Sequence, residues 1–294
     1  PVTLRANTLK ATAEDIAAAL DAAGIAHRSV AWYPDAFILP EAQVSDLWDL
    51  DIYRDGKIYL QSLSSMMPPL VLGAQAGEDI LDMCAAPGGK TTQIAALTQG
   101  QAHLTACEMS IPRAEKLEAN LGRQGAKNVP VMRIDARELD EFFRFDRILL
   151  DAPCTGTGTV ISGNEKSLRG LTEQLLVKCA CSQRALLDRA MGALKPGGTL
   201  VYSTCSILPQ ENEDALQEAL DKHMDCELIP LDGTPSESEA RRAQGAGEDP
   251  HIECNALTEA IAEGHVSAIA NGMPGTLTIP PSRDFEGFYI ALVR

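Results

Sequence analysis

The sequence predicts an α/β protein in which a mostly parallel sheet carries helices on both faces. Two observations lead to this fold class. Apolar strand-like runs alternate with helix-like segments from about residue 57 to the end of the chain, which is typical of parallel sheets with crossover helices. One strand, 80–83, also runs through a turn of small residues into a helix. Open α/β sheets hold nucleotides at such turns.

Residues 1–56 differ from this pattern and predict a small α+β domain. Thr12 and the acids that follow it indicate a helix N-terminus, and apolar residues then recur at helical spacing until Gly24. Both tryptophans, Trp32 and Trp48, lie in this part. We expect them in its core rather than on a surface that stacks with nucleic-acid bases.

Residues 57–294 predict the larger domain. Its expected strands are 57–61, 80–83, 103–108, 129–135, 145–151, 199–204 and 286–293. One expected helix begins at the glycine turn, and three more cover 110–124, 172–194 and 209–223. The segment 232–276 is rich in Gly, Pro, Ser and acids, which favours a long surface loop with a helical piece near 257–262.

Composition narrows the class of protein. The 294 residues include no run long enough to cross a bilayer and no charged-then-apolar start, so we expect a soluble cytoplasmic protein, without a membrane partner and monomeric. Because the chain starts at Pro1, a fragment of a longer protein is also possible. The net charge of −16 argues against a broad basic face for nucleic acid.

The cysteines and histidines predict no metal site and no disulfide framework. The eight cysteines lack Cys-x-x-Cys spacing and the five histidines are scattered. We expect free thiols, most of them buried as packing residues. This expectation applies to Cys107, Cys179, Cys181, Cys226 and Cys254.

The turn of small residues predicts a ligand-binding loop. It contains Cys84, Ala85, Ala86, Pro87, Gly88, Gly89 and Lys90. Two adjacent glycines allow a ligand to approach the backbone closely, although the glycines alone would favour an ordinary turn between strand and helix. A phosphate loop is excluded, because it needs a further glycine five positions before Gly89, where Cys84 stands.

Three predicted strands end in an acid, namely Glu108, Asp135 and Asp151. In a parallel sheet these ends lie at the edge that carries the glycine turn. Glu108 follows Gly89 by about 19 residues, the offset at which a carboxylate reaches ribose hydroxyls. Asp135 is then placed for an adenine amino group. A single acid of this kind is more often a helix cap, but three together favour an adenosine-containing ligand.

Two cysteines follow strand ends at the same edge. Cys154 lies in the segment 151–158 and Cys205 in the segment 203–206. Functional residues concentrate on loops that a rigid scaffold positions. One such cysteine would more often be structural, but two that face one pocket predict a chemical role.

These residues are similar to those of the RsmB/Sun-type RNA cytosine-5 methyltransferases. The matching segments are Asp82-Met83-Cys84-Ala85-Ala86-Pro87-Gly88-Gly89-Lys90-Thr91, Asp151-Ala152-Pro153-Cys154, Ser203-Thr204-Cys205-Ser206, Glu211-Asn212-Glu213 and Gly287-Phe288-Tyr289-Ile290-Ala291. Further matches are Tyr59-Leu60-Gln61 through Met67-Pro68, and Arg113 with Asn120 and Arg123. The resemblance covers about residues 57–231 and 282–294.

The resemblance implies a Rossmann-like class I methyltransferase fold with a seven-stranded sheet, S-adenosyl-L-methionine as cofactor, and rRNA or tRNA as substrate. The loop Cys84–Lys90 would hold the methionine part and ribose of the cofactor, Glu108 the ribose hydroxyls and Asp135 the adenine. Asp151 would lie beside both cofactor and base. Cys205 would be the nucleophile and Cys154 the second cysteine, which helps to release the product.

Cytosine chemistry explains the need for two thiols. Carbon 5 of cytosine is a weak nucleophile until a thiolate adds at carbon 6, so covalent catalysis splits one hard step into two easier ones. The proton on carbon 5 must then leave before the sulfur can. Asp151 could orient or protonate the base. Lys90 could lower a thiolate pKa or neutralise Asp151, and a salt bridge that only holds the loop is equally possible.

The acidic composition limits how the chain could bind RNA, and its two cysteines bear on two alternative functions. Because phosphate binding needs Lys and Arg, RNA binding would rely on a local basic patch, on residues 1–56, on a further domain or on a partner. The candidates for the patch are Lys166, Arg169, Lys178 and Arg283. A DNA cytosine-5 methyltransferase would use Cys154 as its nucleophile, without a loop like that of Cys205. A non-catalytic cofactor-binding or assembly module would have lost the thiols, and both are present.

Overall fold

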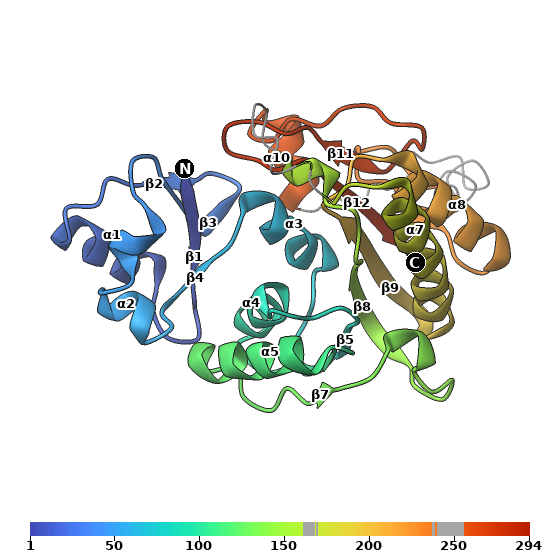
Figure 1. Cartoon of the computed structure of the whole chain (residues 1–294), viewed down its shortest axis with the longest axis horizontal. Helices are drawn as coiled ribbons and strands as arrows, with labels where there is room; N and C mark the ends of the chain where they lie inside the picture. The colour runs from blue at the N-terminus through green and yellow to red at the C-terminus, as the bar shows by residue number, and fades with distance from the viewer. Residues whose placement is uncertain (161–167, 169, 237–238, 240–255) are drawn as a thin grey trace.

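The computed structural model describes residues 1–160, 168, 170–236, 239 and 256–294. These residues form two sheets: a four-stranded sheet near the N-terminus and an eight-stranded sheet built from the rest of the chain. Figure 1 shows the smaller unit beside the helices α3, α4 and α5 of the larger one. No helix among the described residues is both long enough and apolar enough to cross a membrane.

The N-terminal unit is an antiparallel sheet with strand order β2-β3-β1-β4. It contains β1 (Val2–Ala6), α1 (Ala13–Ala22), β2 (Arg28–Val30), β3 (Tyr33–Leu39), α2 (Asp51–Arg54) and β4 (Ile58–Leu60). Thr12 caps α1 as predicted, since its side chain accepts from the Asp15 amide in a capping box. An apolar cluster that includes Ile16 and Leu20 joins α1 to the sheet.

Two expectations for this region are wrong. The strand-like run 57–61 does not open the larger sheet, because β4 pairs with β1 over Leu4↔Leu60 to Ala6↔Ile58. Trp48 is not a core residue, since 55% of its surface is exposed. Trp32 is partly buried and stacks on Phe285, so only one of the two tryptophans packs as expected.

The larger sheet has the strand order β10-β12-β9-β8-β5-β6-β7, with β11 pairing to β12 beyond this path. The strands β5 (Asp79–Asp82), β6 (His103–Cys107), β7 (Val131–Met132), β8 (Phe145–Asp151) and β9 (Leu194–Thr204) pair in parallel. The strands β10 (Leu228–Ile229), β11 (Leu277–Ile279) and β12 (Phe288–Val293) are antiparallel. The predicted fold class is confirmed, with one strand more than expected among the described residues.

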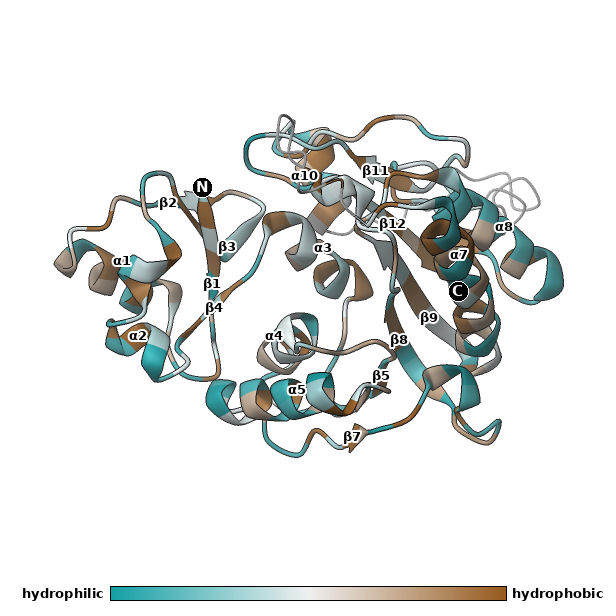
Figure 2. Cartoon of the chain, viewed as in Figure 1, coloured by the Kyte–Doolittle hydropathy of each residue, from teal (hydrophilic) through white to brown (hydrophobic). Residues whose placement is uncertain are grey.

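Helices cover both faces of the larger sheet, as predicted. One face packs against α3 (Leu63–Leu72), α4 (Gly89–Leu97), α5 (Ile111–Gln124) and α10 (Ala256–Ala262). The other packs against α7 (Glu173–Gly192) and α8 (Glu213–Lys222). Successive strand residues alternate between the faces, so Ile80 belongs to the first core and Leu81 to the second. Figure 2 shows the resulting apolar strands between helices whose outer surfaces are more polar.

Several element boundaries differ from those expected. The turn Lys195–Gly198, expected as the stop of α7, lies inside β9, because α7 ends at Gly192. The helix expected from Pro209 begins as a short 3-10 turn, Pro209–Glu211, before α8. Of the expected surface loop 232–276, the residues 237–238 and 240–255 lie outside the described part.

Candidate active site

A cavity of about 370 Å³ opens at the carboxyl ends of β5, β8 and β9. The glycine loop, Asp151 and Cys205 all line it, with Ser62, Thr159 and Glu286 on the side away from the loop. A second cavity of about 60 Å³ contains Glu108 and Asp135, and Cys84 lines both. The predicted convergence of these residues on one sheet edge is therefore confirmed.

The carbonyl groups of the glycine loop are bound by side chains from outside the loop. Arg113 donates to Ala86 O at 2.8 Å and Asn120 to Pro87 O at 2.7 Å, both from α5. Arg5 in β1 donates to Gly89 O at 3.0 Å. These contacts fix the orientation of the peptide groups, and the N-terminal unit thus supports the candidate cofactor loop directly.

Close packing explains the two glycines. Gly88 has φ +106°, which L side chains rarely adopt, and a Cβ there would lie 2.9 Å from Leu117 Cδ1. A Cβ at Gly89 would lie 3.1 Å from the ring of Tyr59, which also lines the cavity. The loop therefore passes close to both α5 and β4, and the positive φ of Gly88 is the stronger requirement for glycine.

Asp82 at the end of β5 was given no role by the sequence analysis. It is 1% exposed and lines the larger cavity. Thr91 Oγ1 donates to Asp82 Oδ2 at 2.7 Å, while Oδ1 is buried without a hydrogen-bond partner. Burial raises the pKa of Asp82 to about 6. Asp82 ends β5 just as Asp151 ends β8, so the same rule could have found it.

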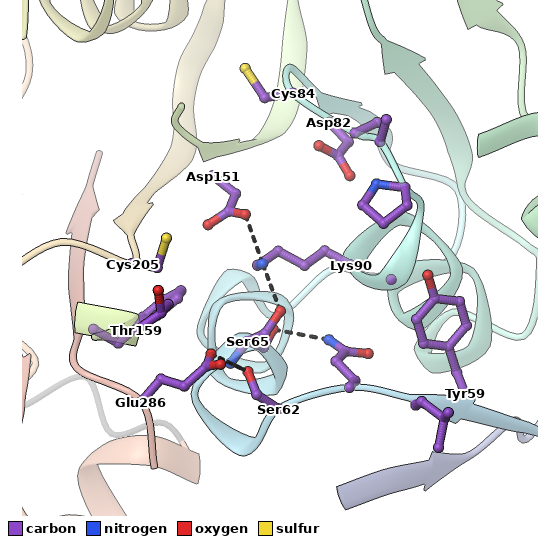
Figure 3. Close-up of a pocket in the computed structure, with 17 residues that line it drawn as sticks. Tyr59, Ser62, Ser65, Asp82, Cys84, Lys90, Asp151, Thr159, Cys205 and Glu286 are labelled. Atoms are coloured by element: carbon purple, nitrogen blue, oxygen red, sulfur yellow. Dashed lines mark hydrogen bonds and ion pairs between the residues drawn. The ribbon is translucent and has the colours of Figure 1, made fainter. Parts of the chain in front are cut away.

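Lys90 and Asp151 form an ion pair inside the cavity, with Nζ and Oδ2 2.7 Å apart. Lys90 also donates to Ser65 Oγ at 2.7 Å, and Ser203 Oγ donates to Asp151 Oδ1 at 2.9 Å. Figure 3 shows Lys90 reaching from the loop toward Asp151. This ion pair fits both expected roles of Lys90, the neutralisation of Asp151 and a salt bridge that holds the loop. The charge of Asp151 raises the pKa of Cys205, and the charge of Lys90 lowers it.

The two predicted cysteines meet at the edge of the cavity, where Cys154 Sγ and Cys205 Sγ are 3.2 Å apart. A hydrogen bond between the thiols lowers the pKa of Cys205 and raises that of Cys154, which burial raises further. Either thiol can donate in the neutral pair, and the directions of the two pKa values favour Cys205 as the group that ionises first, with Cys154 as donor to its thiolate. The convergence on which the sequence interpretation depended is confirmed.

Glu108 and Asp135 line the smaller cavity, and each already has a basic partner. Asp135 does not end a strand as expected, because β7 stops at Met132; it caps a short 3-10 turn by accepting from the Arg137 amide. Glu108 is 4% exposed, accepts from the Ser110 amide and pairs with Arg113 at 3.1 Å. Asp135 pairs with Arg137 at 2.5 Å, which lowers the pKa of Asp135. Arg137 therefore favours the charged form of Asp135, and Arg113 is the ion-pair partner of Glu108 beside the cavity.

The remaining cysteines only partly match the prediction. Cys107 and Cys179 are buried, and burial raises the pKa of Cys107 to about 12. Cys181 is exposed, so its assignment as a packing residue was wrong, and Cys226 is half-buried. Cys254 lies outside the described residues. Within the described ranges, no group of three or more His, Cys, Asp or Glu side chains is placed to hold a metal ion.

The structure tests only half of the expected basic patch. Lys178 on α7 and Arg283 are exposed, while Lys166 and Arg169 fall outside the described part of the chain. Arg283 lines a groove of about 580 Å³ that reaches from the candidate active site past Thr3 of the N-terminal unit. Ser62, Thr159 and Glu286 line both this groove and the 370 Å³ cavity of the candidate active site.

Comparison with known proteins supplies the family. Residues 69–294 match the model of the 16S rRNA methyltransferase RsmB/F family, and residues 1–45 match the ferredoxin-like domain described for RsmF/B-like methyltransferases. The chain belongs to this family. Both sheets described above thus have counterparts in it, and the predicted family is confirmed.

Individual relatives agree with this family. Ribosomal RNA small subunit methyltransferase F of Shewanella amazonensis is 35% identical over 100% of this chain and 58% of its own length. The protein of the same name from Shewanella loihica is 40% identical over 72% of this chain and 45% of its length. A methyltransferase homologue from Pyrococcus horikoshii is 33% identical, with a TM-score of 0.76 over 100% of this chain and 86% of that protein. The chain spans about half the length of the curated relatives.

Proposed function

We propose that this chain is an S-adenosyl-L-methionine-dependent RNA methyltransferase that forms 5-methylcytosine. The observation that carries the proposal is the sulfur pair, with Cys154 and Cys205 3.2 Å apart beside a cavity lined by the glycine loop. A non-catalytic assembly module has no need for two thiols at one cavity. The family of rRNA methyltransferases and the relatives named above favour rRNA as the substrate.

The described residues fit the proposed cofactor. Asp82 Oδ1 is a buried oxygen without a partner at the larger cavity, and an ammonium group such as that of the methionine part would satisfy it. Glu108 would hold the ribose hydroxyls and Asp135 the adenine in the smaller cavity. The loop Cys84–Lys90 and Asp151 complete the set of residues that would hold the cofactor.

The chain would activate the base through its own side chains. Cys205 would add as thiolate to carbon 6 of cytosine, so that a carbon–sulfur bond forms and the 5,6 double bond breaks. The electron pair of that double bond would move onto carbon 5 and the ring, while Asp151 hydrogen-bonds the N3 and N4 edge. Bound S-adenosyl-L-methionine would supply an electrophilic methyl group for carbon 5. Cys154, after losing its own proton to solvent, would accept the proton of carbon 5. The electron pair of that C–H bond would restore the 5,6 double bond, and the bond to Cys205 would break with Cys205 leaving as a thiolate. Lys90 would stay paired with Asp151 beside the base.

We propose that RNA next to the target base lies in the groove between the two units. Thr3 of β1 and Arg283 line this groove, and it joins the larger cavity at Ser62, Thr159 and Glu286. The N-terminal unit, first expected to span residues 1–56, would thus contact RNA. Because β4 completes its sheet, we place the division between the two units after Leu60.

The test is incubation with labelled S-adenosyl-L-methionine and total RNA, followed by mapping of 5-methylcytosine. We expect label in a small number of rRNA cytosines. Cys205→Ala should lower incorporation by about 10³-fold or more, since it removes the nucleophile, while cofactor binding stays within about twofold. Label in DNA alone, or equal incorporation by Cys205→Ala, would overturn the proposal.

A further inference from the structure

The segment between β9 and α8 touches both cysteine loops through two adjacent residues, Glu211 and Asn212. Their side chains are 0% and 1% exposed. A buried carboxylate is costly unless hydrogen bonds replace its hydration. The partners of these two side chains therefore indicate what their burial achieves.

Glu211 holds the loop of Cys154. Its carboxylate accepts from the Thr155 amide at 2.8 Å, from Thr155 Oγ1 at 2.5 Å and from Gln183 Nε2 at 3.3 Å. Gln183 also donates to Pro153 O at 2.9 Å. The residues on both sides of Cys154 are thus fixed by one carboxylate and one amide.

Asn212 holds the loop of Cys205 in the same way. Its Oδ1 accepts from Thr204 Oγ1 at 2.6 Å, and its Nδ2 donates to Ser206 O at 3.0 Å. The residues on both sides of Cys205 are therefore tied to one side chain. Tyr202 OH donates to Glu211 O at 2.5 Å, which anchors the pair itself to β9.

We propose that Glu211 and Asn212 are positioning residues that together set the spacing between the two sulfur atoms. One peptide bond joins them, so a shift of either cysteine loop must strain the hydrogen bonds of the other. We call the hydrogen bonds from Glu211 and Asn212 to the two cysteine loops the clamp. The 3.2 Å distance between Cys154 Sγ and Cys205 Sγ is then a consequence of the clamp. The inference deepens the proposed function, on which the role of the thiols rests.

The spacing matters because a thiol hydrogen bond weakens as its atoms separate. The donor for a Cys205 thiolate is the thiol of Cys154, and this contact is what lowers the pKa of Cys205. A loosened clamp should therefore make Cys205 harder to ionise. A residue that only supported the fold would change stability and leave this property as it was.

The experiment measures alkylation of Cys205 by iodoacetamide against pH, in the chain without cofactor or RNA, with the modified peptide resolved by mass spectrometry. In Glu211→Gln and Asn212→Ala we expect the midpoint of the pH–rate profile to rise by about one unit. The rate at pH 7 should fall by about threefold, because a more basic thiolate is rarer but more nucleophilic. Unchanged midpoints in both folded variants would overturn the proposal.

Matched variants distinguish residues that position the two cysteine loops from residues that only stabilise the fold. Glu218→Gln lies on α8 and removes only an exposed ion pair with Arg184, so its alkylation profile should match the wild type. If the buried variants do not fold, Thr204→Val deletes the hydroxyl that reaches Asn212 and Thr204→Ser keeps it. A shifted midpoint in the valine variant alone supports the clamp, and equal midpoints reject it.

The outcome is independent of methyl transfer. A shifted profile in a protein that methylates no RNA would reject the proposed function and keep the clamp. Methylation with an unshifted profile would do the reverse.

Discussion

Asp82 is a buried acid, and both its burial and its unpartnered Oδ1 disfavour the charged form. Its pKa of about 6 lies above the ordinary value for Asp. An ammonium ligand would bind the ionised form. The affinity should therefore be full above pH 6 and decline as the pH falls below it.

Calorimetry with S-adenosyl-L-homocysteine measures this dependence. We expect the Kd to rise by up to about tenfold for each pH unit below 6. Asp82→Asn should bind weakly and show a flat profile from pH 5 to 8. A flat wild-type profile over this range would contradict the role of Asp82.

The same carboxylate should lower the stability of the chain without ligand. A folded-state pKa above the unfolded value means that the native protein binds a proton more tightly between about pH 4 and 6, so ionisation costs stability above that window. In urea unfolding at pH 7 without ligand, we expect Asp82→Asn to gain about 1–3 kcal/mol. The gain should shrink toward pH 4, and a loss of stability at pH 7 would contradict it.

Residue types at strand ends were readable from sequence, but partners distant in the chain were not. The acids and cysteines at strand ends identified the site because parallel strands place their ends together. Arg5 gave no such signal, since its acceptors at Gln61, Gly89 and Thr92 meet it only through tertiary packing. Cys181 and Trp48 were misplaced because local patterns do not decide which face of an element is covered.

At the scale of elements, the loop of Cys205 depends on a close approach between two backbone segments. Gly158 N donates to Cys205 O at 2.9 Å, and Gly287 N donates to Gly158 O at 2.8 Å. A Cβ at Gly158 would lie 2.0 Å from Gly287 O. The loops that carry Thr159, Cys205 and Glu286 therefore share one tight crossing.

Gly158→Ala tests this crossing. We expect a loss of about 2–4 kcal/mol in urea unfolding, because backbone atoms rather than a flexible side chain must move. Gly192→Ala is the control, since its Cβ would meet only Arg189 Nη1 at 3.7 Å at the end of α7. That variant should be neutral or gain up to about 1 kcal/mol. Equal effects of the two substitutions would contradict the account.

Element types were predicted better than their limits and partners. The strands from β5 to β9 carry apolar runs that must be buried on both faces, and such runs are recognisable without a structure. The run 57–61 had the same local character but pairs with β1, because strand pairing is a property of the tertiary fold. Likewise the Pro-Gly-Gly turn resembled a helix stop, although β9 already includes it.

At the scale of the whole molecule, Arg5 connects the N-terminal sheet to the candidate cofactor loop. Its guanidinium is buried, with Nε 2.9 Å from Gln61 Oε1 and Nη2 2.7 Å from Thr92 Oγ1. It also donates to Gly89 O and lies over the ring of Tyr59. The two units thus share a buried charge directly behind the loop.

Arg5→Lys should uncouple the two units, because an ammonium cannot reproduce the fork of donors. We expect a loss of about 1–3 kcal/mol in urea unfolding and weaker binding of S-adenosyl-L-homocysteine. Arg28→Lys, at an exposed pair with Asp284, should change stability by less than about 0.5 kcal/mol. Binding unchanged in Arg5→Lys would show that the N-terminal unit does not support the loop.

The central claim is that two thiols act on one base, with Cys205 forming the bond and Cys154 allowing its release. The most direct measurement is a denaturing gel of Cys154→Ala after incubation with rRNA and S-adenosyl-L-methionine, with the attached residue identified by mass spectrometry. We expect a covalent protein–RNA species linked through Cys205, absent from Cys154→Ala/Cys205→Ala. No adduct together with undiminished turnover in Cys154→Ala, or a link through another residue, would contradict the account.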